Sequence, residues 1–180
     1  LKLIEQFHPS EIELGLTRVK QIADKLGLLT PTAKVILVGG TNGKGSCVAT
    51  LESLAKQSHL TVGCYTSPHL VCFNERIKVN GANIDDKSLV EAFETIEKIR
   101  EQVALTFFEF TTLAALHCFL KLNLDLLVLE IGLGGRLDAV NIVEPDVSVI
   151  TTIERDHESW LGSDLISIAQ EKSGIYRKTS

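Results

Sequence analysis

One glycine-rich segment carries the strongest chemical signal in the sequence. Gly39 is followed by Gly40, Thr41, Asn42, Gly43, Lys44, Gly45 and Ser46, directly after the apolar, β-branched run 35–38. Glycines let backbone N–H groups crowd around an anion, and the N-terminus of a following helix adds its positive end. The Lys44 ammonium could neutralise the β- and γ-phosphates, and the Ser46 hydroxyl could reach Mg²⁺. The segment therefore predicts an ATP-binding loop.

The loop departs from the common phosphate-binding pattern at one position. That pattern places Ser or Thr directly after Gly-Lys, and Gly45 stands there in this chain. The alternative is a strand-to-helix turn that binds no ligand. The strand-like run before the loop and the helix-compatible run 47–56 after it favour the nucleotide site.

Three residues farther along the chain could act beside this loop. Glu130 ends an apolar run, where a carboxylate is costly unless it meets a cation, so it is either a Mg²⁺ ligand or the partner of a base such as Arg136. His157 lies in a loop after a strand, where a histidine is usually structural or solvated, and Mg²⁺ prefers oxygen ligands. Lys172 ends a polar helix and reads, from the residues alone, as a surface lysine. The glycine-rich stretch 132–135 is either a plain turn or a loop that approaches a ligand closely.

The composition excludes several classes of protein. The 180 residues are 44% hydrophobic and 23% charged, as in a globular domain, and the net charge of −5 argues against a nucleic-acid partner. No run approaches the ~20 apolar residues of a membrane span, and the N-terminus has no secretory pattern. The four cysteines form no C-x-x-C pair, which indicates reduced thiols and a cytoplasmic location. The chain starts at Leu1 and contains no methionine, so we expect it to be trimmed at its N-terminus.

The elements that must position these residues alternate between helix and strand. A capping box at Ser10 and Glu13 predicts that the first helix starts there. Strands are predicted at 35–38, 61–65, 125–131 and 146–151, a hairpin at 76–84, and later helices at 47–56, 86–103, 109–122 and 164–172. This order predicts an α/β domain of three layers, with helices on both faces of a mostly parallel sheet. Ligands of such sheets lie beyond the carboxyl ends of the strands, where the candidate residues fall.

Several segments together resemble the Mur ligase superfamily and, more narrowly, the folylpolyglutamate synthases and their bifunctional bacterial form. The resemblance covers nearly the whole chain in family order, and it includes the Gly-Lys-Gly-Ser form of the loop. The matching segments are 13–16 (Glu-Leu-Gly-Leu), 40–46, 66–70 (Thr-Ser-Pro-His-Leu), 108–110, 129–139, 156–157 and 171–175.

The resemblance implies a role for each candidate residue. The phosphates of ATP would bind at 40–46, and Lys172 would be carbamylated by CO₂ into a carboxylate-like group, which replaces its interpretation as a surface lysine. The implied Mg²⁺ ligands are Ser67, Glu130 and His157, and the implied catalytic residues are Lys44, Lys172 and His157. The implied pterin- and pteroate-binding residues are Glu13, Leu14, Gly15, Leu16, Thr106, Phe107, Phe108, Glu109, Leu137, Asp138 and Ala139.

The resemblance also implies a reaction. A carboxylate of dihydropteroate or of a reduced folate would take the γ-phosphate of ATP, and the amine of L-glutamate would then displace phosphate to form an amide. The implied partners are these small molecules, with ATP and Mg²⁺ as cofactors, in a monomer that binds neither nucleic acid nor membrane. The segments 13–16 and 106–109 favour the bifunctional form over a folylpolyglutamate synthase that acts on folates alone.

The chain departs from the family in three ways. Glu154 and Arg155 stand where relatives carry a small and an apolar residue, and Cys72 stands where bifunctional relatives often carry a basic one. Family members are more than twice as long, so we expect residues 1–180 to be an N-terminal ATP-binding domain that is incomplete at its C-terminal end and lacks the second domain. We expect this chain by itself to show no ligase turnover.

Two interpretations from other functional classes remain, a non-catalytic nucleotide-binding module and an NTPase of another kind. The absence of Ser or Thr directly after Lys44 argues against the second of these.

Overall fold

A six-stranded sheet organises the computed structural model, which describes residues 13–178. The strand order is β4-β3-β2-β5-β1-β6. The strands are β1 (Lys34–Gly39), β2 (Val62–Tyr65), β3 (Ile77–Val79), β4 (Ala82–Asn83), β5 (Leu126–Glu130) and β6 (Val147–Ile150). The strands β2, β5, β1 and β6 are parallel, and β3 and β4 continue the sheet antiparallel. The prediction of a mostly parallel sheet is confirmed.

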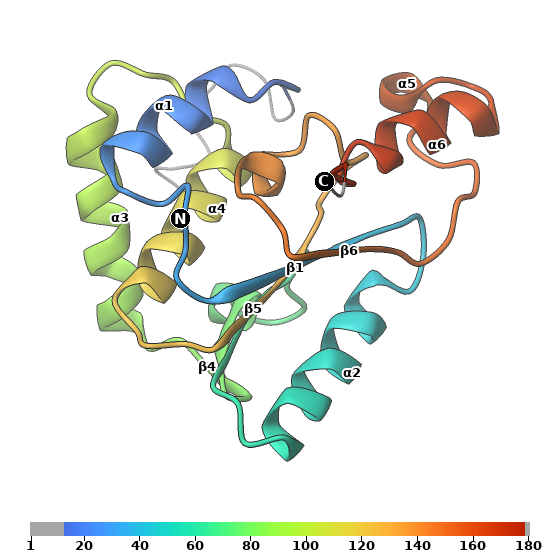
Figure 1. Cartoon of the computed structure of the whole chain (residues 1–180). Helices are drawn as coiled ribbons and strands as arrows, with labels where there is room; N and C mark the ends of the chain where they lie inside the picture. The colour runs from blue at the N-terminus through green and yellow to red at the C-terminus, as the bar shows by residue number, and fades with distance from the viewer. Residues whose placement is uncertain (1–12, 179–180) are drawn as a thin grey trace.

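Helices cover both faces of this sheet (Figure 1). The helix α2 (Lys44–Gln57) packs against β1, β2 and β5 on one face, and its core includes Val38, Val48 and Val128. On the other face lie α1 (Thr17–Lys25), α3 (Asp86–Arg100) and α4 (Phe107–Leu120), whose core includes Leu37 and Leu129. Alternate residues of β1 and β5 thus pack into the cores on the two faces of the sheet, because successive side chains of a strand point to opposite faces. The prediction of three layers is confirmed.

The most deeply buried helix is α4. Every residue from Glu109 to Phe119 is buried, because α1 and α3 cover the side of α4 that faces away from the sheet. Thr106 begins the helix with a capping box: its hydroxyl accepts from the Glu109 N–H at 3.2 Å, and the Glu109 carboxylate accepts from the Thr106 N–H at 2.8 Å. This cap fixes one wall of the site described below.

Short elements complete the edges of the sheet. The hairpin β3–β4 turns through Asn80 and Gly81, both with positive φ, as the Asn-Gly pair predicts. The 3₁₀ turns η2 (Phe73–Arg76) and η3 (Ala139–Ile142) and the single-turn helix α5 (Glu158–Leu161) carry no periodic pattern and were not predicted. The last helix is α6 (Leu165–Ser173). None of the helices within residues 13–178 is long and apolar enough to cross a bilayer.

Several predicted helix boundaries are wrong. Within residues 13–178 the first helix begins at Thr17, and it does not continue back toward the predicted capping box because Gly15 breaks the helical path with a φ of 154°. Ser10, the predicted cap, lies outside the described residues. The helix α3 ends at Arg100 instead of 103, and α4 spans 107–120 instead of 109–122, because the Thr106 cap starts it two residues earlier.

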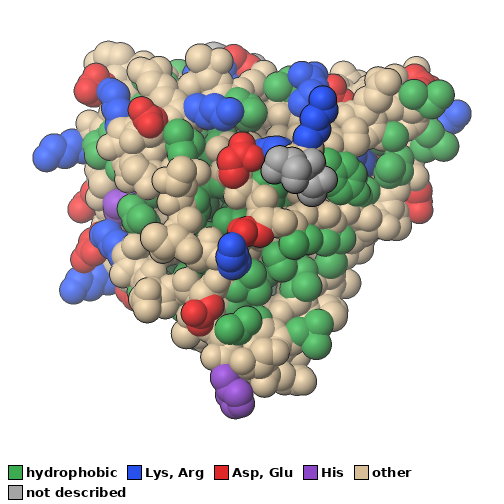
Figure 2. Space-filling model, in the orientation of Figure 1, with side chains coloured by type: hydrophobic (Ala, Val, Ile, Leu, Met, Phe, Trp, Pro, Cys, Tyr) green, Lys and Arg blue, Asp and Glu red, His purple; other side chains and the backbone are tan. Residues whose placement is uncertain are grey.

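One edge of the sheet is formed by β6. Within the described part of the chain it pairs with β1 alone, so its other edge is open. Figure 2 shows hydrophobic side chains gathered over β6 and α2. Val147 of β6 and Leu54 of α2 are about half exposed.

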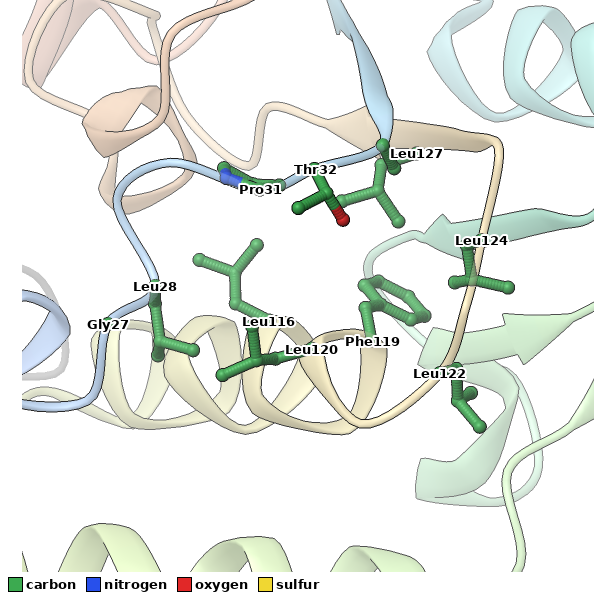
Figure 3. Close-up of a pocket in the computed structure, with 11 residues that line it drawn as sticks. Gly27, Leu28, Pro31, Thr32, Leu116, Phe119, Leu120, Leu122, Leu124 and Leu127 are labelled. Atoms are coloured by element: carbon green, nitrogen blue, oxygen red, sulfur yellow. The ribbon is translucent and has the colours of Figure 1, made fainter.

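A small apolar cavity lies between α4 and the chain that enters β1 (Figure 3). It measures about 30 Å³, and leucines and Phe119 form most of its wall. That volume would hold about one water molecule, yet the lining offers few polar partners for it. The cavity is a packing gap and not a candidate for substrate.

Candidate active site at the carboxyl ends of the strands

The predicted phosphate loop connects β1 to α2. Gly43 has a φ of 82° and serves as the N-cap residue, so Lys44 is the first residue of the helix. A side chain at Gly40, where φ is 140°, would overlap the Thr151 hydroxyl. The Lys44 ammonium donates to the carbonyls of Gly40 and Thr41 at 3.0 and 3.2 Å. The helix N-terminus and its lysine therefore occupy the position that the phosphate prediction requires.

The segment after β6 holds this loop from the side. The Thr152 carbonyl accepts from the Thr41 N–H at 2.9 Å, and the Thr151 hydroxyl donates to the Asn42 carbonyl at 2.6 Å. Glu154 adds a contact of its own, because its carboxylate accepts from the Asn42 amide at 3.1 Å. The first of the two unusual charges before Asp156 thus contacts the phosphate loop.

Glu130 ends β5 at the bottom of the site. It is 5% exposed, and its carboxylate accepts from the Ser67 N–H at 3.2 Å. Burial raises the pKa of Glu130, while the Ser67 hydrogen bond and the nearby Lys44 charge oppose that rise. Arg136, the alternative partner, pairs instead with Glu171 at 2.8 Å. The side chain therefore stands beside Ser67 and the positive charge of the phosphate loop, with no basic residue at ion-pair distance among residues 13–178.

His157 begins α5 with a left-handed backbone, at a φ of 49°. Its side chain is exposed, lies 3.6 Å from the Asp156 carboxylate, and lines the same cleft as Ser67 and Lys44. Within the described residues, no three His, Cys, Asp or Glu side chains gather into a metal-binding group. A metal site here would therefore depend on the serine oxygen as well as on Glu130 and His157, which are oxygen and imidazole donors that Mg²⁺ or Mn²⁺ can accept.

Lys172 lies near the end of α6 and is 4% exposed, so its interpretation as a surface residue is wrong. Burial lowers the pKa of Lys172, the Lys44 charge lowers it further, and Asp156 opposes both. The glycine-rich stretch 132–135 packs against this helix end, where a Cβ at Gly135 would lie 2.8 Å from two carbonyl oxygens of the helix. A buried lysine thus faces the cationic end of the phosphate loop.

The predicted acceptor-binding segments meet in one cleft of about 450 Å³. It is lined by residues from 13–15, 106–109 and 137–139 together with Lys44, Ser67 and His157. Leu16 is the exception, because it packs against the core and does not line the cleft. Gly132 and Leu133 of the glycine-rich stretch and Pro68 of the segment 66–70 also line it, so the stretch 132–135 does reach the cleft. Arg76 lines it as well, although the sequence did not single it out.

Two carboxylates of these segments are buried. Glu109 is 3% exposed and pairs with Arg18 at 3.1 Å in addition to its capping bond. Asp138 accepts from the N–H groups of Leu133 and Val140 at 2.8 and 2.9 Å, yet burial raises its pKa to about 7. At neutral pH Asp138 is therefore close to half protonated and can either donate or accept a hydrogen bond in the cleft.

Comparison of the sequence with known proteins shows the family to which the chain belongs. No protein-family model matches the chain. The dihydrofolate synthase/folylpolyglutamate synthase of Escherichia coli is 48% identical over 98% of the chain, and that of Bacillus subtilis is 40% identical over 93%. The chain belongs to the dihydrofolate synthase/folylpolyglutamate synthase family. It spans 42% of the length of the E. coli protein and 40% of that of the B. subtilis protein.

Solved structures of dihydrofolate synthase/folylpolyglutamate synthases share the fold. E. coli FolC in complex with DHPP and ADP superposes with a TM-score of 0.97 at 47% identity, covering 99% of this chain and 43% of FolC. The bifunctional enzyme with Mn, AMPPNP and L-glutamate bound superposes with a TM-score of 0.91 at 47% identity, covering 98% of this chain and 43% of that one. The first of these two enzymes thus binds ADP and DHPP, and the second binds AMPPNP, Mn and L-glutamate.

Proposed function

We propose that this chain is the ATP-binding part of a ligase that joins L-glutamate to dihydropteroate and to reduced folates through an acyl phosphate. One observation carries the proposal: Lys44 of the phosphate loop and residues of the three predicted acceptor segments line a single cleft. A carboxylate in that cleft would lie next to the γ-phosphate of a nucleotide on the loop. Both reactants are anions, so their approach requires concentrated positive charge, and positioning supplies much of the remaining catalysis.

The positive charge would come from Lys44, from the N-terminus of α2 and from Mg²⁺. Ser67, Glu130 and His157 are the residues that would hold the metal, which would neutralise charge on the phosphates when bound. Glu130 fits this role because its carboxylate is buried beside Ser67 and has no basic partner within the part of the chain that the structure describes. The chain itself positions the phosphates with the Lys44 ammonium and the N–H groups of the loop.

Lys172 is proposed to be carbamylated. The reaction needs the neutral amine, which attacks CO₂ and releases one proton, and a lowered pKa makes that form more abundant. The buried ammonium group of Lys172 is repelled by the partly buried one of Lys44, and carbamylation would turn that repulsion into an attraction. The burial of Lys172 is the observation that supports this proposal.

The acceptor is proposed to lie along 13–15, 106–109 and 137–139. Asp138, with its pKa near 7, is suited to a pterin ring, which offers both donors and acceptors of hydrogen bonds. We further propose that the chain is a single ATP-binding domain of a larger cytoplasmic, monomeric enzyme. The cytoplasmic location is supported by four free cysteines, at 47, 64, 72 and 118.

Phosphate release by the complete gene product tests this proposal. With Mg·ATP and L-glutamate present, release should depend on dihydropteroate and, in a separate assay, on tetrahydrofolate. Release with tetrahydrofolate alone would establish the second candidate, a monofunctional folylpolyglutamate synthase. Release with neither acceptor would contradict the ligase and favour a nucleotide-binding module.

A further inference from the structure

An arginine that the sequence did not single out forms part of the cleft wall. Arg76 ends η2, is 8% exposed, and lines the cleft together with Ser67 and Phe107. No carboxylate among residues 13–178 forms an ion pair with it, although a buried guanidinium normally has one. Its charge is therefore left for something that enters the cleft.

Neighbouring side chains fix the orientation of this guanidinium. It stacks near the rings of Phe73 and Phe107, at 5.6 and 5.4 Å from their centres. Its Nε–H donates to Nδ1 of His69 at 2.8 Å. The two terminal nitrogens make no hydrogen bond within the described residues, and they are not among the polar atoms that are sealed from solvent without a partner. They therefore open toward the cleft.

The backbone places Arg76 near the reacting end of the cleft. The Arg76 carbonyl accepts from the Thr66 N–H at 2.9 Å. Ser67, which follows Thr66 in the chain, donates its own N–H to the Glu130 carboxylate. Arg76 is thus anchored one residue away from the proposed metal site, while its side chain reaches Phe107 in the acceptor-binding segment.

We propose that Arg76 binds the α-carboxylate of a folate acceptor and so determines specificity between the two acceptors. The inference rests on the proposed function. A guanidinium with two free N–H groups matches a carboxylate in a bidentate geometry. A reduced folate carries an α-carboxylate beside its reacting γ-carboxylate, whereas dihydropteroate carries only the reacting one. Arg76 would therefore strengthen folate binding and leave dihydropteroate binding nearly unchanged.

The test compares two variants of the complete gene product, Arg76→Gln and Arg76→Lys. For each, KM and the calorimetric Kd are measured with monoglutamyl tetrahydrofolate and with dihydropteroate. Lys78→Gln is the matched control, because it removes the same charge from β3, opposite Cys64 on the face of the sheet that α2 covers. Thermal unfolding of each variant reports any loss of packing against Phe73 and Phe107.

We expect Arg76→Gln to raise the KM and Kd of tetrahydrofolate by about 10- to 100-fold, the range of a charged hydrogen-bonded pair, and those of dihydropteroate by less than about 3-fold. Arg76→Lys should raise the tetrahydrofolate values by about 3- to 10-fold, because it keeps the charge and loses the planar fork. If Arg76→Gln does not fold, the KM and Kd values of Arg76→Lys for the two acceptors test the proposal.

Equal changes for both acceptors, or a change for neither, would overturn the role of Arg76. The proposed function fails in a different way, because the unmodified protein would then release no phosphate with either acceptor.

Discussion

The two ends of the cleft are built differently. The end that is proposed to bind phosphate, called the phosphate end below, is one continuous segment, residues 40–46, braced by the segment 151–154. The end that is proposed to bind the acceptor, called the acceptor end, combines residues from 13–15, 67–76, 106–109 and 132–139, and no two of these segments are neighbours in the sequence. A diphosphate is bound mainly by backbone groups and one lysine, whereas an aromatic acceptor needs side chains from several directions. The phosphate end can therefore be identified from a short motif, and the acceptor end depends on the whole fold.

The two ends also differ in how they carry charge. The phosphate end concentrates Lys44, buried Lys172 and a helix N-terminus around a site for anions. The acceptor end buries Glu109 and Asp138 and pairs them with backbone N–H groups or with Arg18. Variants at the two ends should accordingly change different kinetic parameters.

The largest effect is expected at the phosphate end. Lys44→Ala removes the only lysine of the phosphate loop, and kcat/KM for ATP should fall by roughly 100-fold or more, as when one charge-stabilising donor is removed. Lys56→Ala, at the opposite end of α2, is the control and should change little. Unchanged rates in Lys44→Ala would contradict the distinction between a phosphate end and an acceptor end, because the loop would then not act on phosphate.

The next effect is expected at the acceptor end, in the pH dependence of stability. The Asp138 pKa is raised to about 7, so between pH 4 and 7 the unfolded chain ionises first and the folded state loses stability as pH rises. Relative to Asp138→Asn, the free energy of unfolding of the unmodified protein should fall by up to about 4 kcal/mol over that interval and change little above pH 7. Urea unfolding at several pH values measures this difference.

Asp146→Asn is the control with the opposite sign. The hydrogen bond from Lys34 lowers the pKa of Asp146, so its contribution is present above about pH 4 and is lost as pH falls further. A difference between Asp138→Asn and the unmodified protein that does not vary with pH would contradict the raised pKa.

A smaller effect separates acceptor from nucleotide. Thr106→Ala removes the α4 cap that forms part of the cleft wall and should lower the free energy of unfolding by about 1 kcal/mol. The KM for the acceptor should rise while the KM for ATP stays unchanged. Thr106→Ser keeps the hydroxyl and should restore both the free energy of unfolding and the KM for the acceptor. Equal changes in the two KM values would mean that the ends are not independent.

The smallest effect is expected at Glu154. Glu154→Gln keeps an acceptor for the Asn42 amide and removes a negative charge from the phosphate loop. The KM for ATP should fall by about 2- to 5-fold at low salt, and the difference should shrink as salt screens the charge. A raised KM would show that the carboxylate orders the loop more than it repels phosphate.

The sequence predicted the strands, the parallel sheet and the glycine-rich turn between β1 and α2 because their signals are local. An apolar run such as 35–38 and the glycines that follow it define a strand and a turn by themselves. The burial of Lys172 and the free guanidinium of Arg76 could not be predicted, because each depends on segments more than thirty residues away. The late start of α1 could have been predicted from Gly15, which interrupts the proposed helix.

The position of β1 has a consequence for synthesis on the ribosome. This strand follows residue 33, yet it is flanked by β5 and β6, which end at residues 130 and 150. At about 5 to 20 residues per second, roughly 5 to 25 seconds pass between the synthesis of β1 and that of β6. The phosphate loop, although it is the most compact motif in the sequence, is therefore among the last parts of the nascent chain to reach its final geometry.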